Sequence, residues 1–347
     1  MFLYLTADRI NSQSGGGQVT YQEHLALLEL GHTTTITIEP NLDPFEQDLK
    51  ILKEVKNLTT PIKLAHCYSG CLSQTVQYLK SIGVLVTYTV AAHDKDISRH
   101  EHERLGFQFP YPHLIYPELW KRYIAGYLAS TVIVAPSSYS KRTIEKYAGY
   151  AETPIEIIPH GTNLPESISP LPNIFTVGYL GAVGPDKGLC YLLEAWKKLN
   201  YKDAILILAG RDTTSPFFQS FVKKYGGGNI QLMGWVNNIE DFYSKISLYI
   251  QPSATEGFGI EILEAMAHGR PVICSEGAGA VDIVGGFLEF GFEARNIKEI
   301  VEAISYVKSR KDKLKGMGEI NRKEAEKYTW DKIRARYQQL WKKLLGE

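Results

Sequence analysis

The segment from Pro252 to Pro271 carries the residue types best suited to chemistry. An apolar strand is expected to end at its start, a glycine-bearing turn follows, and apolar residues then recur at helical spacing until Gly269. The amides and the positive dipole end of such a helix N-terminus favour an anion, and glycines let a phosphate approach the backbone. Glu256 lies just before this helix and Glu264 lies inside it. The pattern therefore predicts an anion site flanked by two carboxylates.

A carboxylate beside a diphosphate is repelled, so these glutamates fit the site only as hydrogen-bond acceptors for hydroxyl groups. A ribose or a hexose offers such hydroxyls. Two acids beside a phosphate site therefore favour a sugar nucleotide as the ligand. The alternative is that Glu256 and Glu264 are both solvated glutamates at a helix end.

This segment resembles a motif of the large retaining glycosyltransferase family called group 1, or family four. The matching pattern is a glutamate, seven residues and a second glutamate within E-G-F-G-I-x-x-L-E-A-M-A-H-G-x-P-V-I. The resemblance implies that Glu256 contacts the donor hexose and that Glu264 binds the donor ribose. It assigns contacts with the sugar and phosphate to the backbone of Phe258, Gly259 and Ile260.

A second glycine-bearing turn, over 178–188, resembles the family's diphosphate-binding loop. Its lysine is Lys187, and a point charge on a flexible stem suits a diphosphate. The family's usual arginine is replaced by Ala182, which leaves the diphosphate one cation short. Arg211, at the end of another expected strand, is the candidate replacement, and a surface role is the alternative.

Two further segments are placed by the same resemblance. Trp235 and Val236 follow a short strand where the family binds the nucleotide base by main-chain contacts; the alternative for Trp235 is a core position. Gly16 and Gly17 belong to a glycine run before a helix expected over 18–30. This run resembles the family's loop that faces the donor phosphates, and a flexible loop without a ligand is the alternative.

His93 stands where an expected strand leaves the sheet, and the resemblance implies that it orients the donor sugar together with Glu256. With Lys187, these residues form the predicted catalytic set. Asp94-Lys-Asp96 superficially matches the Asp-x-Asp metal motif of the other major glycosyltransferase fold but lacks the context of that fold. No metal site and no cofactor are therefore expected, because a lysine and a helix dipole neutralise the diphosphate.

The elements that must position these residues are short apolar strands that alternate with amphipathic segments, which predicts an α/β fold with two doubly wound parallel sheets. Strands are expected near 2–7, 35–38, 62–66, 84–90, 131–135, 156–158, 175–180, 204–209, 230–233, 248–251 and 272–275. We expect an N-terminal acceptor-binding domain over 1–165, a C-terminal nucleotide-sugar-binding domain over 166–327 and a final helix over 328–347. The resemblance implies the GT-B fold, in which two Rossmann-like domains face a cleft and the last helix crosses back to the first domain.

Composition excludes several classes of protein. The 347 residues are 44% hydrophobic and 22% charged with zero net charge, which argues against bulk disorder and against nucleic acid as a partner. Four scattered cysteines are too few for a disulfide framework. No apolar run has the length of a membrane helix and no signal peptide is recognisable, so a cytoplasmic location is expected. Aromatic residues with Lys121 and Arg122 in 105–123 favour either a buried cluster or a peripheral contact with the inner face of a membrane.

The resemblance implies transfer of a hexose from a nucleotide-diphosphate sugar to an acceptor, with retention of configuration and without a metal. The sequence identifies neither the donor base and sugar nor the acceptor, which is a sugar, a lipid-linked molecule or another small molecule. Two alternatives stay open: a sugar-nucleotide epimerase that shares the fold, and a non-catalytic subunit that binds a sugar nucleotide.

Overall fold

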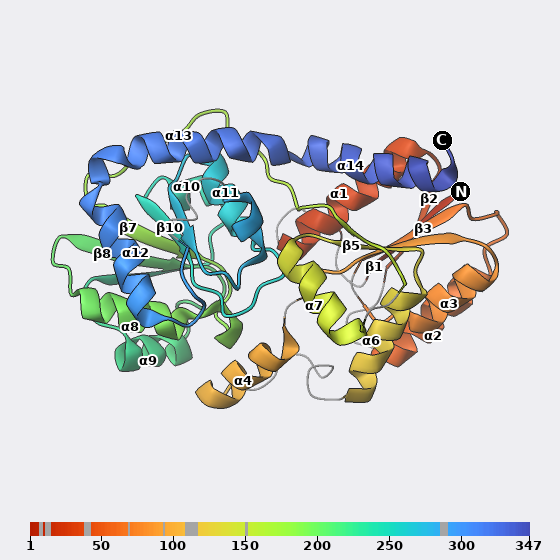
Figure 1. Cartoon of the computed structure of the whole chain (residues 1–347), viewed down its shortest axis with the longest axis horizontal. Helices are drawn as coiled ribbons and strands as arrows, with labels where there is room; N and C mark the ends of the chain where they lie inside the picture. The colour runs from red at the N-terminus through yellow and green to blue at the C-terminus, as the bar shows by residue number, and fades with distance from the viewer. Residues whose placement is uncertain are drawn as a thin grey trace. The chain divides into compact units, whose positions relative to one another are not determined.

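The computed structural model describes residues 1–6, 10, 15–37, 43–68, 70–92, 94–107, 117–149, 152–284 and 291–347. The chain forms two compact units, shown in Figure 1. The first unit contains Met1–Ala92, Phe109–Gly161 and Trp330–Glu347, and the second contains His93–Gln108 and Thr162–Thr329. The contacts thus group His93–Gln108 with the second unit, although this segment lies within the first predicted domain.

The first unit is a parallel six-stranded sheet with the strand order β2-β1-β3-β4-β5-β6. Its inner strands are largely buried because helices cover both faces of the sheet, whereas the two edge strands are more exposed. The strands are β1 (Phe2–Thr6), β2 (Thr33–Thr37), β3 (Leu64–Tyr68), β4 (Leu85–Thr89), β5 (Val132–Ala135) and β6 (Ile155–Ile157). The helices are α1 (Gly15–Leu30), α2 (Pro44–Lys56), α3 (Ser73–Ser81), α6 (Pro117–Ala129), α7 (Ser138–Ala148) and α14 (Trp330–Leu345).

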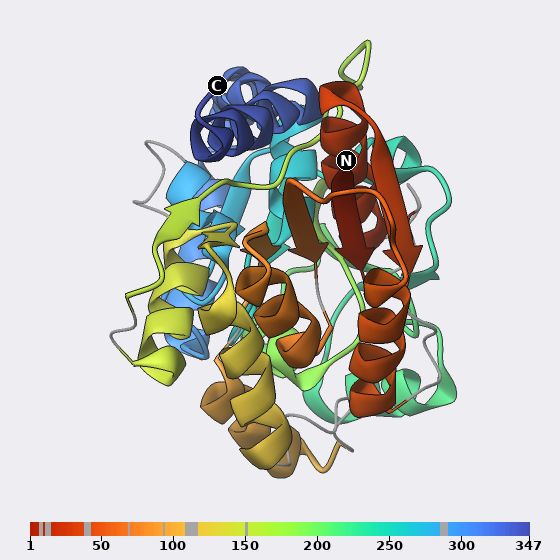
Figure 2. The same ribbon diagram turned by 90° about the vertical axis from the view of Figure 1, so that its right-hand side faces the viewer.

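The last helix, α14, packs on α1 within the first unit, and Figure 2 shows the two helices side by side. The hydroxyl of Tyr337 donates to Glu23 Oε1 at 2.7 Å, and the indole of Trp341 donates to Thr87 Oγ1 at 3.0 Å. His66 Nε2 lies 3.1 Å from the other oxygen of Glu23, and all these side chains are buried. The apolar stripe of the final helix therefore covers the first unit, as predicted.

The second unit is a parallel five-stranded sheet with the order β11-β10-β7-β8-β9. Its strands are β7 (Phe175–Leu180), β8 (Ala204–Ala209), β9 (Ile230–Gly234), β10 (Leu248–Gln251) and β11 (Val272–Cys274). Its α-helices are α4 (Lys95–Leu105), α8 (Leu189–Leu199), α9 (Pro216–Tyr225), α10 (Ile239–Tyr243), α11 (Ile260–Ala267), α12 (Ile297–Ser309) and α13 (Leu314–Ala325). Short 3-10 turns are η1 (Pro185–Lys187), η2 (Gly279–Ile283), η4 (Lys311–Lys313) and η5 (Glu326–Tyr328).

The strand order of the second sheet creates a switch point beside its central strand. From β7 the chain adds β8 and β9 on one side, and it then returns to add β10 and β11 on the other side. The loops after β7 and β10 therefore leave the sheet in opposite directions and open a crevice at the carboxyl edge, where ligands of such sheets bind. The first sheet has the same arrangement at β1 and β3.

The predicted fold class is confirmed: two parallel α/β sheets form, and the final helix returns to the first unit. Every predicted strand is present within a few residues of its expected bounds. All four cysteines lie in described segments, and each is buried and forms no disulfide. Among the described residues, no helix combines the length and the apolar character needed to span a membrane.

The N-terminus of α3 depends on a carboxylate from a neighbouring helix. Leu72 stands at its N-cap and supplies no capping side chain, whereas the buried Asp48 of α2 accepts the amides of Gln74 at 2.7 Å and Thr75 at 3.0 Å. We expect Asp48→Ala to lower the free energy of unfolding by about 1–3 kcal/mol, because these donors lose their acceptor. Urea unfolding followed by circular dichroism measures this change.

The control is Glu46→Ala, which removes an exposed carboxylate from the same helix. It should change the free energy of unfolding by less than about 0.5 kcal/mol. Equal effects of the two substitutions would show that Asp48 does not cap α3.

Candidate active site

The residues predicted to do chemistry in the second unit gather at the carboxyl edge of its sheet. Lys187 follows β7, Arg211 follows β8, Trp235 follows β9 and Glu256 follows β10. Because β7 and β10 are neighbours, the lysine turn and the glutamate loop flank the switch point. The sheet therefore brings together side chains that lie far apart in the sequence.

Lys187 and Glu256 form an ion pair in this crevice, where Lys187 Nζ donates to Glu256 Oε2. Their side chains are 23% and 19% exposed, so both remain accessible to a ligand. Burial lowers the pKa of Lys187, but the carboxylates of Glu256 and Glu261 outweigh burial and hold that pKa above its ordinary value. The lysine is therefore a permanent cation at neutral pH.

Close packing of two loops sets the position of this lysine. Gly188, with φ of +66°, begins α8 directly after η1, and a Cβ atom there would stand 1.9 Å from the carbonyl oxygen of Pro252. The carbonyl oxygen of Asp186 accepts the amide of Ala254 at 2.7 Å. Only glycine allows the lysine turn to lie this close to the loop after β10.

The loop that carries Glu256 is held by main-chain hydrogen bonds. The amide of Glu256 donates to Gly277 O at 2.8 Å, and its carbonyl accepts the amide of Gly279 at 3.0 Å. The N-cap of α11 is Gly259, with φ of +91°, which has no side chain to cap the first amides of the helix. The helix therefore presents its N-terminus, with its positive dipole end, beside the ion pair.

The residues around this N-terminus are largely buried. Phe258 and Ile260 are 3% and 7% exposed, and their main-chain contacts with a donor stay a prediction. Glu264 is 5% exposed, and the hydroxyl of Tyr243 lies 3.4 Å from its Oε2. Burial and then the charge of Glu264 raise the pKa of Tyr243 well above its ordinary value. The neutral tyrosine therefore remains a hydrogen-bond donor.

Sequence reasoning missed a third carboxylate at this site. Glu261 is the second residue of α11, and it lies at a position that the motif leaves variable. Burial, with a contribution from Glu256, raises its pKa, while Lys187 opposes the shift. The signal available in the sequence was an acidic residue in the first turn of a helix that follows the glycine turn.

Arg211 and Ala182 lie on neighbouring loops. The amide of Val183, next to Ala182, donates to Arg211 O at 3.3 Å. Gly210, which precedes Arg211 with φ of +118°, has room for no Cβ because Gly181 O would lie 2.0 Å away. Arg211 is an exposed residue. Its assignment as the replacement cation stays a prediction.

The two residues predicted to bind the nucleotide base, Trp235 and Val236, lie in a segment that is accessible to solvent. Trp235 is 57% exposed, and its Nε1 donates to Asn237 Oδ1 at 3.0 Å. The alternative that Trp235 is a core residue is therefore wrong. Val236 is half-buried beside it, and the contact of these two residues with a base stays a prediction.

Three predicted site residues lie nearer the N-terminus, and the structure describes two of them, Gly16 and Gly17. Gly16 and Gly17 lie in the first turn of α1, which begins at Gly15 and thus earlier than predicted. Their role toward a donor stays a prediction. His93 lies outside the described residues. Its chain neighbour Asp94 donates its amide to Thr255 Oγ1 at 2.7 Å, one residue before Glu256.

Asp94 has a structural task in the described chain. It is the N-cap of α4, and its Oδ1 accepts the amides of Asp96 at 2.9 Å and Ile97 at 3.1 Å. Within the described segments, no group of three or more His, Cys, Asp or Glu side chains is arranged to hold a metal ion.

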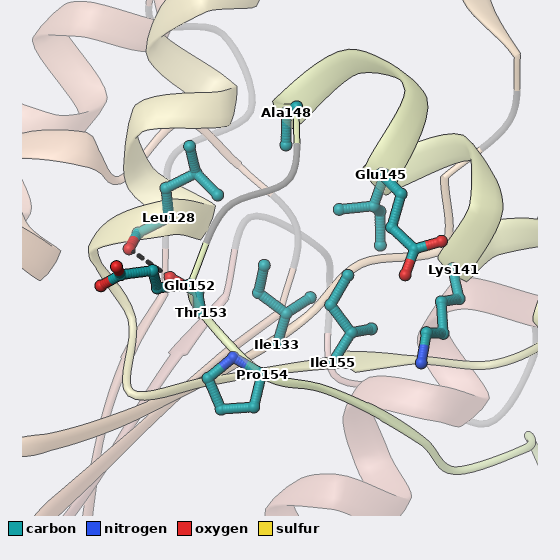
Figure 3. Close-up of a pocket in the computed structure, with 11 residues that line it drawn as sticks. Leu128, Ile133, Lys141, Glu145, Ala148, Glu152, Thr153, Pro154 and Ile155 are labelled. Atoms are coloured by element: carbon teal, nitrogen blue, oxygen red, sulfur yellow. Dashed lines mark hydrogen bonds between the residues drawn. The ribbon is translucent and has the colours of Figure 1, made fainter.

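A separate hollow of about 240 Å³ lies in the first unit, and Figure 3 shows its lining. Its walls come from the later turns of α7 and the start of β6, with Leu128, Ile133 and Ile155 as apolar lining. It therefore lies near the amino ends of β5 and β6, away from the edge where such folds bind ligands. None of the predicted site residues lines it.

Known glycosyltransferases are similar to this chain in sequence. Residues 172–309 match the family model described as "Glycosyl transferases group 1". An uncharacterized glycosyltransferase of Haemophilus influenzae is 24% identical over 345 residues, which cover 93% of this chain and 95% of that protein. The chain spans about half the length of the first curated relatives it matches, 47% and 48%.

Solved structures share the fold. Sucrose-phosphate synthase from Thermosynechococcus elongatus superimposes with a TM-score of 0.79 at 18% identity, covering 99% of both chains. HepE of Anabaena, solved in complex with UDP and glucose, gives a TM-score of 0.73 at 14% identity and covers 99% of this chain and 100% of its own. The second unit is therefore similar to the group 1 glycosyltransferases over the residues that the family model matches, and the motif around Glu256 lies within them.

Proposed function

We propose that this protein transfers a hexose from a nucleotide-diphosphate sugar to an acceptor, with retention of configuration and without a metal ion. The observation that carries the proposal is the Lys187–Glu256 ion pair beside the uncapped N-terminus of α11, at the switch point of the sheet. A cation, a helix N-terminus and a carboxylate in one crevice match the anionic and the hydroxyl-bearing parts of one ligand.

Lys187 and the first amides of α11 bind the donor diphosphate. The raised pKa of Lys187 keeps its charge at neutral pH, and the charge opposes the negative charge that grows on the diphosphate as it departs. When the donor binds, Glu256 exchanges its lysine partner for hydroxyl groups of the hexose. The carboxylate is thereby kept hydrogen-bonded after the lysine turns to the phosphate.

The rest of the nucleotide extends along the same edge of the sheet. Glu264 accepts hydroxyls of the ribose from within α11, and the base lies against the backbone at Trp235 and Val236. Arg211 supplies the second cation, which is missing at position 182 because alanine stands there. The positions of these residues in the second unit support the roles, and each role can be tested by substituting the residue.

The reaction forms a bond between the acceptor oxygen and the anomeric carbon while the bond from that carbon to the diphosphate oxygen breaks. The acceptor attacks from the face that the leaving group occupies, and its proton passes to the departing diphosphate. His93 and Glu256 orient the sugar. Configuration is retained because entry and departure occur on one face.

Anabaena HepE was solved in complex with UDP and glucose, which makes UDP-glucose the first donor to test. The absence of the family's arginine at Ala182 favours a second candidate, a subunit that binds a sugar nucleotide without turnover. Release of the nucleoside diphosphate from a nucleotide sugar separates the two: the enzyme releases it and the binding subunit does not.

We expect Lys187→Ala and Glu256→Gln each to lower turnover by about a hundredfold or more, because each removes a directed charge from the transition state. The fold should persist, since both side chains are partly exposed. Initial rates of nucleoside diphosphate release measure the effect. Lys298→Ala and Glu302→Gln, which break an exposed pair of the same unit, serve as controls. Rates close to wild type in either site variant would refute the assignment.

Arg211→Ala should weaken binding of the donor diphosphate by about tenfold to a hundredfold, because loss of a hydrogen bond to a charged group costs about 1.5–3 kcal/mol. Isothermal titration with UDP, GDP and ADP at low salt provides the measurement. Lys198→Ala removes an exposed cation from α8 as a control. Affinities that Arg211→Ala and Lys198→Ala leave alike would return Arg211 to a surface role.

Activity should survive EDTA, because a lysine and a helix dipole neutralise the diphosphate in this mechanism. The test is turnover before and after chelation, followed by addition of Mg²⁺ or Mn²⁺. Activity that is lost with EDTA and restored by either ion would contradict a metal-independent reaction.

A further inference from the structure

The helix α4 connects two stretches of the first unit in the sequence but packs within the second unit. It contacts the turn that carries Lys187, and its N-terminus is bonded to the loop that carries Glu256. Both halves of the proposed donor site therefore touch one helix. Three groups of contacts along α4 explain how it is held.

The first contact fixes the start of α4. The amide of Asp94 donates to Thr255 Oγ1 at 2.7 Å, and Thr255 is 2% exposed. Thr255 directly precedes Glu256 in the chain, and Asp94 directly follows His93. The hydrogen bond therefore ties the neighbour of the proposed catalytic histidine to the neighbour of the proposed sugar-binding glutamate.

The second contact centres on Glu101, whose side chain is completely buried. Its two carboxylate oxygens each lie 2.9 Å from the hydroxyl of Tyr191, which is in the first turn of α8. Arg104 Nη2 donates to Glu101 Oε2 at 2.8 Å. A buried carboxylate is costly unless it is paired and hydrogen-bonded, so Glu101 holds Tyr191 and Arg104 in one arrangement.

The third contact joins the end of α4 to the same helix start. Arg104 donates to Cys190 Sγ at 3.1 Å, and its guanidinium lies 4.9 Å from the centre of the Tyr191 ring. Cys190 and Tyr191 follow Lys187 and Gly188 within one helical turn. A shift of the start of α8 would therefore move the lysine turn with it.

We propose that Glu101 is a positioning residue of the donor site: through Tyr191 it holds the start of α8, and with it the lysine turn, where Lys187 meets Glu256. Through the amide of Asp94 the same helix is bonded to the glutamate loop at Thr255. This inference rests on the proposed function. Glu101 touches neither the donor nor the reacting atoms, so its effect passes through Lys187.

A positioning role and a purely stabilising role have different consequences. Lys187 acts most strongly on the charge of the departing diphosphate, so its misplacement lowers kcat more than it weakens donor binding. A misplacement of about 1 Å can lower a rate by about a hundredfold. A helix that only adds stability would change the melting temperature and leave kcat unchanged.

The experiment compares Glu101→Gln and Tyr191→Phe with Tyr201→Phe. Tyr201 follows the other end of α8 and donates from its hydroxyl to Ser305 Oγ at 3.1 Å, so its substitution removes a tyrosine hydrogen bond that lies away from the lysine turn. Turnover of UDP-glucose, GDP-mannose and ADP-glucose gives kcat and KM. Hydrogen–deuterium exchange at residues 185–191 reports the order of the turn without requiring turnover.

We expect kcat to fall about tenfold to a hundredfold in Glu101→Gln and Tyr191→Phe, with a smaller change in KM. Amide exchange at 185–191 should accelerate in both, while Tyr201→Phe should match wild type in kcat and in exchange. Unchanged exchange in Tyr191→Phe, or losses of kcat no larger than that of Tyr201→Phe, would overturn the inference. If wild type turns over none of the three nucleotide sugars, the proposed function fails, and the exchange data alone decide the role of Glu101.

Discussion

A lysine and a glutamate that neutralise each other form the centre of the candidate site, and in the proposed function a nucleotide-sugar donor must separate them. Lys187 needs an anion to replace its carboxylate, and Glu256 needs hydroxyl donors to replace its ammonium. A ligand that offers only one of these leaves the other charge without a partner, which is costly in a partly buried crevice. A nucleotide sugar offers both within one molecule. In the proposed function, the ion pair therefore favours a ligand that carries both groups over a ligand that carries one of them.

The rest of the second unit keeps these two side chains in reach of each other. The strand order places β7 beside β10, so that loops distant in the sequence meet at one edge of the sheet. Gly188 allows the lysine turn to approach Pro252, and the hydrogen bonds of Glu256 with Gly277 and Gly279 hold the glutamate loop. The buried carboxylate of Glu101 adds α4 as a support for the start of α8. These contacts are short and directional, and small displacements would therefore change the electrostatics of the crevice.

Much of this arrangement is predictable from the sequence. Buried parallel strands are short apolar runs, and every strand was found near its expected bounds because burial on both faces leaves a strong pattern. The carboxyl ends of such strands meet at one edge, which is why Lys187 and Glu256, each after a strand, are expected at the same edge of the sheet. The resemblance to group 1 glycosyltransferases supplied the roles of individual residues.

Other features depend on tertiary contacts that the sequence does not mark. In the sequence, Glu101 cannot be distinguished from an exposed glutamate on a polar helix. Only the packing of α4 in the second unit buries its side chain. Trp235 is apolar in type but 57% exposed, because its place after β9 rather than its residue type decides its exposure.

The most direct test of the central claim is isothermal titration of wild type and Glu256→Gln with UDP and with UDP-glucose. The exchange of partners predicts that Glu256→Gln binds UDP more tightly than wild type does, because Lys187 is released, and binds UDP-glucose more weakly. A loss of affinity for both ligands, or no change in either, would contradict it.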